Sequence, residues 1–270
     1  MSDLTPEQQV LKEAYVRARG YWRDWTEGLL RLDPAFLEAY GKYGGYSAEN
    51  GPLSPKMREL IYVALDASAT HLFRSGLALH LRLALKEGAT AREIIDVFRL
   101  ATMQGLDGCN LGIGILAEEL ASAGLQADHA ELTKEQQALR DAYIAQFGDW
   151  PDFCDQWLRC DPGYFAVLLD LLADRPGGDG LDRRSQSLIS LALNACFTAL
   201  NPQGLRVQIR RALLLGIGQR DIRQVLQMAA HLGVHACALG VPVLMEALEE
   251  RASTAGAGEG GKEAGEGGRT

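Results

Sequence analysis

The stretch "LSPKMRELIYVALDASATHLFRSGLALHLRLALKEGATAREIIDVFRLA", residues 53–101, decides the fold. Ser54 followed by Pro55 is an N-cap with proline at the first helical position, and it predicts a helix to about residue 68. A Leu-rich second helix follows and ends at the glycine of "KEG". Thr90 and Glu93 then form a capping box that opens a third helix. Since no apolar and polar residues alternate as in a strand, we predict an all-α protein.

Beyond this stretch, the chain contains an internal sequence repeat. "TPEQQVLKEAY" (residues 5–15) is echoed by "TKEQQALRDAY" (residues 133–143), an offset of 128. The same offset relates many later pairs: Trp22/Trp150, Asp33/Asp161, Leu60/Leu188, Gly76/Gly204, Gly105/Gly233 and Cys109/Cys237. Such self-similarity indicates a duplicated unit. We predict a first repeat over residues 1–125, a second, degenerate repeat over 126–251, and a disordered Gly/Ala/Glu tail over 252–270.

Composition and charge exclude several classes of protein. With 47% hydrophobic and 23% charged residues the chain is globular, and its net charge of -8 argues against nucleic acid or an anionic membrane as partner. No apolar run approaches the roughly 20 residues that span a bilayer. The five cysteines are an odd number without a CxxC pair, and no apolar signal segment begins the chain. We therefore expect reduced thiols in a cytoplasmic protein.

Comparing the two repeats singles out a set of titratable residues. Four positions carry ionisable side chains in the first repeat and neutral ones in the second: Glu59/Ser187, Asp66/Asn194, His71/Ala199 and His80/Gln208. Other charged positions keep their charge in both: Arg82/Arg210, Arg92/Arg220 and Glu93/Asp221. We infer that the first repeat retained a proton-handling set, whereas the second retained the scaffold.

Helical spacing is compatible with a cluster of these side chains. Glu59, Tyr62 and Asp66 are three and four residues apart, so they share one stripe of a helix. His80 lies in the middle of the next helix, where an imidazole is costly to bury without a partner. His71 and Arg74 fall at the turn between these two helices.

The motifs of residues 53–101 also carry a family resemblance. "RELI", the histidine that begins "HLRLALKEGAT" and the "REI" that follows resemble the carboxymuconolactone decarboxylase family, which is related to the alkylhydroperoxidase D proteins. The likeness is good over residues 53–120 and weaker over 181–248. It implies two tandem helical repeats of the alkylhydroperoxidase D-like / carboxymuconolactone decarboxylase type packed as a pseudo-dimer. It also implies a homo-oligomeric ring, for duplicated chains a trimer of tandem repeats.

The departure from the family pattern favours one branch of it. Peroxidases of this type use a CxxC on the helix before the histidine, and the corresponding stretch here is "HLFR", without a thiol. The resemblance therefore implies a carboxymuconolactone decarboxylase-like enzyme, acting on a small carboxylated lactone or another anionic intermediate of aromatic-compound catabolism. We expect no cofactor.

The hypothesis assigns a role to each candidate residue. His80 is the proton donor, Glu59 is its orienting partner or the base, and His71 with Arg74 holds the departing carboxylate. Asp66 is a further substrate-binding candidate. We expect no metal, because His231 and His235, although four residues apart, have no acidic residue between them and are better explained by packing.

Two alternatives stay open from the sequence. The chain could be a non-catalytic helical scaffold or binding protein of the same fold, with His80 hydrogen-bonded inside the core. A peroxidase that acts through a non-standard thiol is the third reading.

Overall fold

The computed structural model describes residues 3–125, 131–173 and 179–259. These residues form helices and no strand, so the all-α prediction is confirmed. In chain order the helices are α1 (Pro6–Arg19), α2 (Asp24–Leu32), α3 (Pro34–Asn50), α4 (Pro55–Asp66), α5 (Arg74–Lys86), α6 (Ala91–Thr102), α7 (Gly105–Ser122), α8 (Lys134–Phe147), α9 (Asp152–Cys160), α10 (Pro162–Leu172), α11 (Arg183–Ala195), α12 (Pro202–Leu214), α13 (Gln219–Ala230), the 3₁₀ turn η1 (His231–Val234) and α14 (His235–Glu259).

Helix bounds recur at the offset found in the sequence. α5 and α12 begin and end 128 residues apart, and so do α6 and α13. Local signals explain the agreement: Thr5 and Thr133 each close a capping box at the start of a helix, and a left-handed glycine ends each of these helices. Residues 128 apart are called counterparts below.

The chain divides into two compact units, and each draws on both repeats. The first unit comprises residues 1–50 and 231–270. In it, α2 of the first repeat packs along α14 of the second. Gly28 allows this close approach, since a Cβ there would collide with Val241. The core of this unit is aromatic and aliphatic: Tyr15, Trp25, Leu29, Leu30, Leu37 and Val241.

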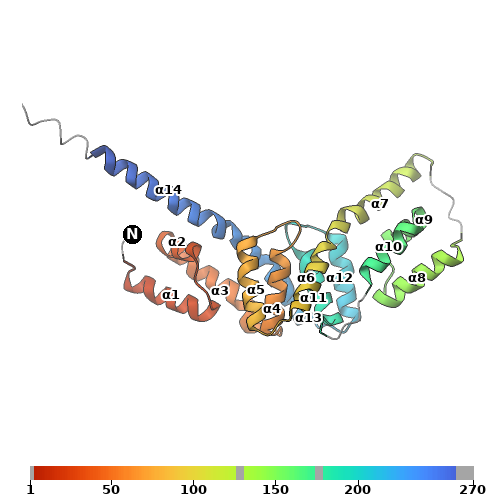
Figure 1. Ribbon diagram of the computed structural model, residues 1–270, viewed down its shortest axis with the longest axis horizontal. Helices are drawn as coiled ribbons and strands as arrows, with labels where there is room; N and C mark the ends of the chain where they lie inside the picture. Colours follow the sequence, from red (N-terminus) through yellow and green to blue (C-terminus); the bar gives the residue numbers. More distant parts are fainter. Residues whose placement is uncertain (1–2, 126–130, 174–178, 260–270) are drawn as a thin grey trace, which may run out of the picture. The chain divides into compact units, whose positions relative to one another are not determined.

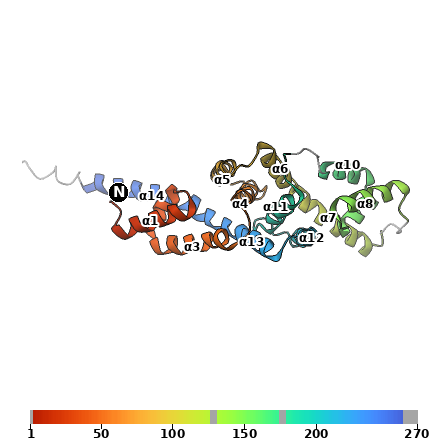
Figure 2. The same cartoon turned by 90° about the horizontal axis from the view of Figure 1, so that it is seen from below.

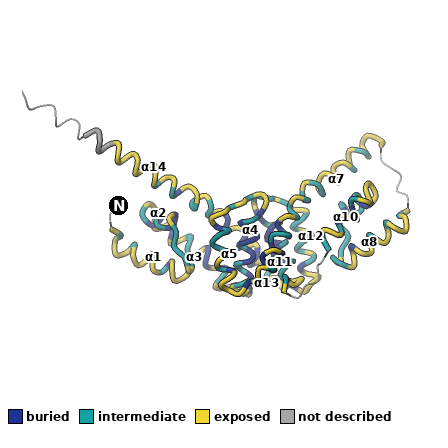
Figure 3. The backbone as a smooth tube through the Cα atoms, viewed as in Figure 1, coloured by how far each residue is buried: buried dark blue, intermediate teal, exposed yellow. Residues whose placement is uncertain are grey.

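The second unit comprises Gly51–Ala230 and is built around α4 and α11. Figure 1 shows each of these helices beside the helix that follows it, α5 or α12, and Figure 3 shows that they are the most buried elements. α7 leaves this centre to pack on α9 of the second repeat. Figure 2 shows α4 and α11 next to each other in the centre. The fully buried side chains of the centre are aliphatic: Leu60, Ile61, Leu65, Leu188, Ile189, Leu191 and Leu193.

Contacts between the repeats inside this unit are reciprocal. The Leu53 amide donates to Gln224 Oε1 at 2.8 Å. The amide of its counterpart, Leu181, donates to Oδ2 of Asp96, the counterpart of Gln224, at 3.1 Å. Two-fold-related copies produce this pattern, in which residue i meets j and j meets i.

Two details differ from, or add to, the sequence-based picture. Disorder was predicted from residue 252, yet α14 continues to Glu259, because alanine and the polar residues there are compatible with a helix; residues 260–270 lie outside the described residues. By length and composition, the helical stretch Gln219–Thr254, with mean hydropathy 1.6, could cross a membrane. One such stretch is weak support for a membrane span, since apolar core helices meet the same criterion.

Candidate functional site

His80 and Glu59 meet across the α4–α5 pair. The His80 Nδ1 atom and the Glu59 Oε2 atom are 2.7 Å apart, a short hydrogen bond that becomes an ion pair when the imidazole is protonated. Their side chains are only 15% and 18% exposed. The apolar face of α5 thus carries an imidazole because α4 provides a carboxylate, and Nε2 remains as the ring atom that can exchange a proton with a ligand.

Tyr62 supports the imidazole from the same helix as Glu59. Its ring stacks on His80 with the centroids 4.6 Å apart and the planes inclined by 28°. The sequence places Tyr62 on the stripe of Glu59 and Asp66, but it gives no reason to assign it a role. The imidazole of α5 is thus held by two side chains of α4, Glu59 and Tyr62.

Asp66 is the most buried member of the group. Its residue is 2% exposed, and burial raises the pKa of its carboxyl to about 7, while His80 opposes the rise and Glu59 adds to it. Gly76 makes room for it, since a Cβ at this glycine would lie 2.5 Å from Asp66 Oδ2. The expected stripe on α4 therefore runs from Glu59 to Asp66, and its Asp66 end faces Gly76 in the first turn of α5.

His71 approaches Asp66 at the turn between the helices. A side-chain ligand atom of each residue lies within 4.8 Å of the other, and burial lowers the pKa of His71. Leu72 next to it has a φ of 51°, a left-handed backbone conformation that residues other than glycine rarely adopt. Its counterpart Leu200 has a φ of 44°, so both repeats build this turn in the same way.

Arg74 is not brought to the pair. It is exposed at the first position of α5. His80 follows six residues later, about 9 Å along the helix axis and roughly 120° around it. The structure thus gathers Glu59, Asp66, His71 and His80, and leaves Arg74 on the rim.

His231 and Cys154 lie in apolar surroundings that disfavour their charged forms. His231 is 5% exposed against the Tyr43 ring, and burial lowers its pKa to about 4. Cys154 is buried, which raises the pKa of its thiol to about 12 and makes a thiolate unfavourable near neutral pH.

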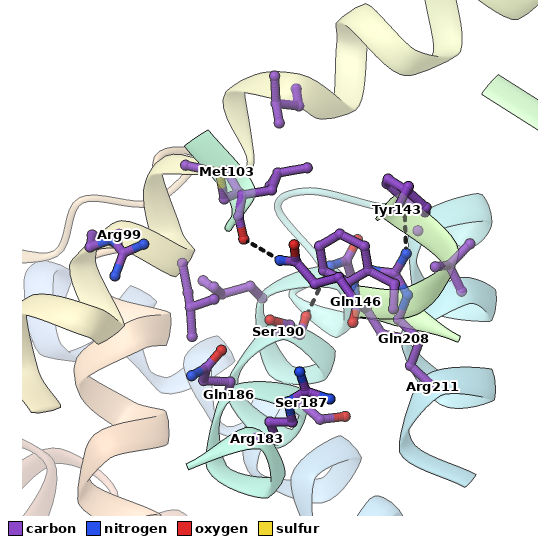
Figure 4. A pocket seen from close by; sticks show the side chains of 18 of the residues that line it. Arg99, Met103, Tyr143, Gln146, Arg183, Gln186, Ser187, Ser190, Gln208 and Arg211 are labelled. Carbon is purple, nitrogen blue, oxygen red and sulfur yellow. Dashed lines mark hydrogen bonds between the residues drawn. The ribbon is translucent and has the colours of Figure 1, made fainter. Parts of the chain in front are cut away.

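The second repeat contains a feature that the sequence did not reveal. A cavity of about 880 Å³ lies among α6 to α12 and is lined by the counterparts of the first-repeat cluster: Ser187 for Glu59, Ser190 for Tyr62, Asn194 for Asp66 and Gln208 for His80. In Figure 4 the labelled side chains surround it, with Met103 above, Arg99 at the left and Arg211 at the right. The sequence signal was that these four positions hold neutral residues, of which Ser187 and Ser190 are smaller than Glu59 and Tyr62 and leave space there.

Comparison with known proteins agrees with the fold and the motifs. The model of the carboxymuconolactone decarboxylase family matches residues 34–107. A crystal structure from Burkholderia xenovorans LB400, of a protein provisionally named a gamma-carboxymuconolactone decarboxylase subunit, is similar over 91% of this chain and 99% of its own. The two are 30% identical, with a TM-score of 0.85. No curated protein matches the sequence.

Proposed function

Because this chain belongs to the carboxymuconolactone decarboxylase family, we propose that it is a cytoplasmic decarboxylase of a small carboxylated lactone or a related intermediate of aromatic-compound catabolism. The observation that carries the proposal is the 2.7 Å contact between His80 and Glu59. An imidazole held by a carboxylate in a partly buried site is a standard arrangement for general acid–base catalysis.

The chemistry needs one proton and a place for two electrons. The bond between the ring carbon and the carboxylate breaks, CO₂ leaves, and the electron pair stays on the carbon, delocalised into the lactone. Protonated His80 then delivers its Nε2 proton to that carbon, while Glu59 keeps the Nδ1–H hydrogen-bonded and so fixes the ring. A proton from solvent restores the imidazolium.

Asp66 and His71 suit the carboxylate end of the substrate. Since burial raises the pKa of Asp66 to about 7, a large share of this carboxyl is protonated near neutral pH and can donate a hydrogen bond to an anion. His71 lies next to it and supplies a second donor. Exposed Arg74 attracts the anionic substrate to the entrance rather than holding it at the pair.

Assembly belongs to the same proposal. Helices of the second unit leave large apolar side chains in solvent, among them Leu85 (53% exposed) and Leu214 (63% exposed). Apolar side chains of this size mark subunit interfaces where they gather into a patch, and we propose a homo-oligomer, a trimer of these duplicated chains, as the family resemblance implies.

The test replaces His80 by the residue of its counterpart. We expect His80→Gln to lower the rate of CO₂ release from carboxymuconolactone by about 10²–10⁴-fold, the usual loss when a general acid is removed. Helix content by circular dichroism should stay unchanged, since Gln208 occupies the same position of α12. Arg82→Gln is the matched control, an exposed residue two positions further on the same helix, and it should keep full activity.

Two results would contradict the proposal. Wild-type protein that releases no CO₂ from any carboxylated lactone tested would favour the scaffold reading. A His80→Gln variant as active as the Arg82→Gln control would remove His80 from the chemistry.

A further inference from the structure

We propose that the cavity of the second repeat is a separate binding site for an uncharged small organic molecule with an apolar body and a carbonyl or hydroxyl group. This site goes beyond the reaction assigned to His80, since it is built on the other hairpin, α11–α12, with α6 to α10 completing its walls, and it lacks the His–Glu pair.

Size and walls fit a small organic ligand. At about 880 Å³ the cavity is within the roughly 300–1,000 Å³ common for ligand pockets. Its walls are largely apolar and come from the seven helices α6 to α12, with Leu100, Met103, Phe153, Leu168 and Val207 among the lining residues. An apolar lining of this kind is suited to the hydrocarbon part of a ligand.

The charge of Arg211, a largely buried side chain of the lining, is neutralised by Asp149. The Arg211 guanidinium donates from Nε and a terminal nitrogen to Asp149, at 3.1 and 2.9 Å, and donates at 2.7 Å to the Tyr143 hydroxyl. The Arg211 and Asp149 side chains are 16% and 6% exposed. An anionic ligand would have to compete with Asp149 for this arginine, at a large desolvation cost.

The other charged side chains of the lining are engaged as well. Asp96 accepts from Arg99 at 3.1 Å and from a backbone amide. Asp182 caps α11 by accepting from the Ser185 amide at 2.7 Å, and Arg183 has a partner. Burial raises the pKa of Asp107, which favours its neutral form, although a hydrogen bond from Asn201 opposes this. A charged ligand would therefore have to compete with these existing contacts, whereas an uncharged one needs no counter-charge.

Two neutral polar side chains remain to recognise such a ligand. Ser187 is 7% exposed, and its hydroxyl has no hydrogen-bond partner in the described part of the chain. An unsatisfied buried hydroxyl is unfavourable, so a ligand that accepts its hydrogen bond would relieve this cost. The Gln208 side chain also lines the cavity and is not bound to another described residue. Its amide can both donate and accept.

The first repeat provides a built-in contrast. The counterparts of Ser187 and Gln208 are Glu59 and His80, which pair with each other at 2.7 Å. In the second repeat both groups are uncharged, and Ser190 leaves open the position where Tyr62 stacks on His80. The α11–α12 hairpin thus has neutral polar groups where the α4–α5 hairpin has the proposed proton-transfer pair.

The experiment uses two probes that differ by one carboxylate. Coumarin is a neutral aromatic lactone, and coumarin-3-carboxylate is its anionic analogue; both are titrated into full-length protein and followed by fluorescence and calorimetry. All titrations use the Glu59→Ser/His80→Gln background, which lacks the proposed catalytic pair, and the cavity variants described next assign the binding to the second repeat. We expect one saturable coumarin site per chain and at least tenfold weaker binding of the carboxylate.

Ser190→Tyr locates the site. This variant introduces the ring that the first repeat already accommodates at Tyr62, so the helix should tolerate it while the cavity loses volume. We expect coumarin binding to weaken at least tenfold. Gln208→Leu removes the amide at similar volume and serves as the second variant, with an expected loss of about tenfold. Arg206→Gln, an exposed residue of α12, is the control that should bind as before.

The proposal is overturned by any of three results. These are no saturable coumarin binding up to its solubility, equal affinity for the two probes, or unchanged binding by both folded cavity variants. Because the readout is binding in a catalytically disabled background, failure here is distinguishable from failure of the proposed reaction.

Discussion

The hairpin α4–α5 and its counterpart α11–α12 share their scaffold and differ in their chemistry. Both have a left-handed leucine in the turn and a small glycine facing a side-chain oxygen of the preceding helix. Both are tied to the third helix of their repeat by an ion pair of 2.7 Å. The residues concerned are counterparts throughout: Leu72/Leu200, Gly76/Gly204, Asp66/Asn194, Lys56/Arg184 and Glu93/Asp221.

The difference lies in the groups that can carry a proton. Asp66 is buried with a raised pKa, whereas Asn194 at the same place is uncharged and satisfied, since its amide donates to the Ser190 carbonyl at 2.9 Å and its oxygen accepts from Asn201 at 3.0 Å. Burying a titratable group costs free energy that an amide avoids. The comparison teaches that this fold does not require the titratable set, so its presence in one repeat points to function.

The largest expected effect comes from moving the pair between hairpins. A chain with Glu59→Ser, His80→Gln, Ser187→Glu and Gln208→His has the pair in the second repeat only. We expect CO₂ release to stay about 10³-fold or more below the wild-type rate, because Asn194 replaces Asp66 and no aromatic ring stacks on the new imidazole.

The reference for this experiment is the chain with only the first two substitutions. A relocated pair that restores turnover to within tenfold of wild type would show that the pair alone defines the site. The surrounding Asp66, Tyr62 and His71 would then have no part in the reaction, and the comparison between the hairpins would reduce to two residues.

The next effect concerns an ion pair that exists in one repeat only. Arg211 pairs with Asp149, and the counterparts of these residues are Leu83 and Tyr21. Arg211→Leu introduces the residue of the first repeat but leaves the Asp149 carboxylate buried without its partner. We expect the free energy of unfolding in urea to fall by about 3–5 kcal/mol.

The double variant Arg211→Leu/Asp149→Asn separates the pair from the packing. We expect it to recover most of the loss, since neither an unpaired carboxylate nor an unpaired guanidinium then remains. If the double variant is as unstable as the single one, the loss belongs to the arginine's packing against the Tyr143 and Phe147 rings.

Much of the second unit was predictable because its signals are local. Ser54 caps α4 and Thr90 forms its capping box with Glu93 as expected, and Asp182, the counterpart of Ser54, caps α11 in the same way. The contact of Glu59 with His80 agrees with two sequence features. Glu59 lies on a polar stripe of one helix, and His80 lies on the apolar helix that follows, where a buried imidazole needs a hydrogen-bond partner. Such inferences use a period of 3.6 residues and need no knowledge of distant contacts.

The exchange of helices and the cavity were not predictable in this way. α7 packs on α9 and α14 packs on α2, although the two helices of each pair belong to different repeats. The sequence of α14 has no strong apolar stripe from which its packing partner could be predicted. The cavity depends on residues brought together from α6 to α12. Helix packing, rather than helix formation, decides both.

The smallest effect follows the pH dependence of Asp66. Its folded-state pKa of about 7 exceeds the ordinary value near 4, so the folded chain binds more protons than the unfolded chain between these values, and the free energy of unfolding falls as pH rises through this window. Asp66→Asn, which introduces the residue of its counterpart, removes this dependence. We expect the free energy of unfolding of Asp66→Asn, relative to that of the wild type, to rise by about 1–3 kcal/mol from pH 4 to pH 7 and to stay constant at higher pH. Urea unfolding at a series of pH values measures the difference, with Glu38→Gln, which removes an exposed carboxylate, as the control for net charge. Parallel curves for Asp66→Asn and wild type would mean that Asp66 is ionised in the folded protein, and the proposed hydrogen bond from its carboxyl to an anionic substrate would be lost with it.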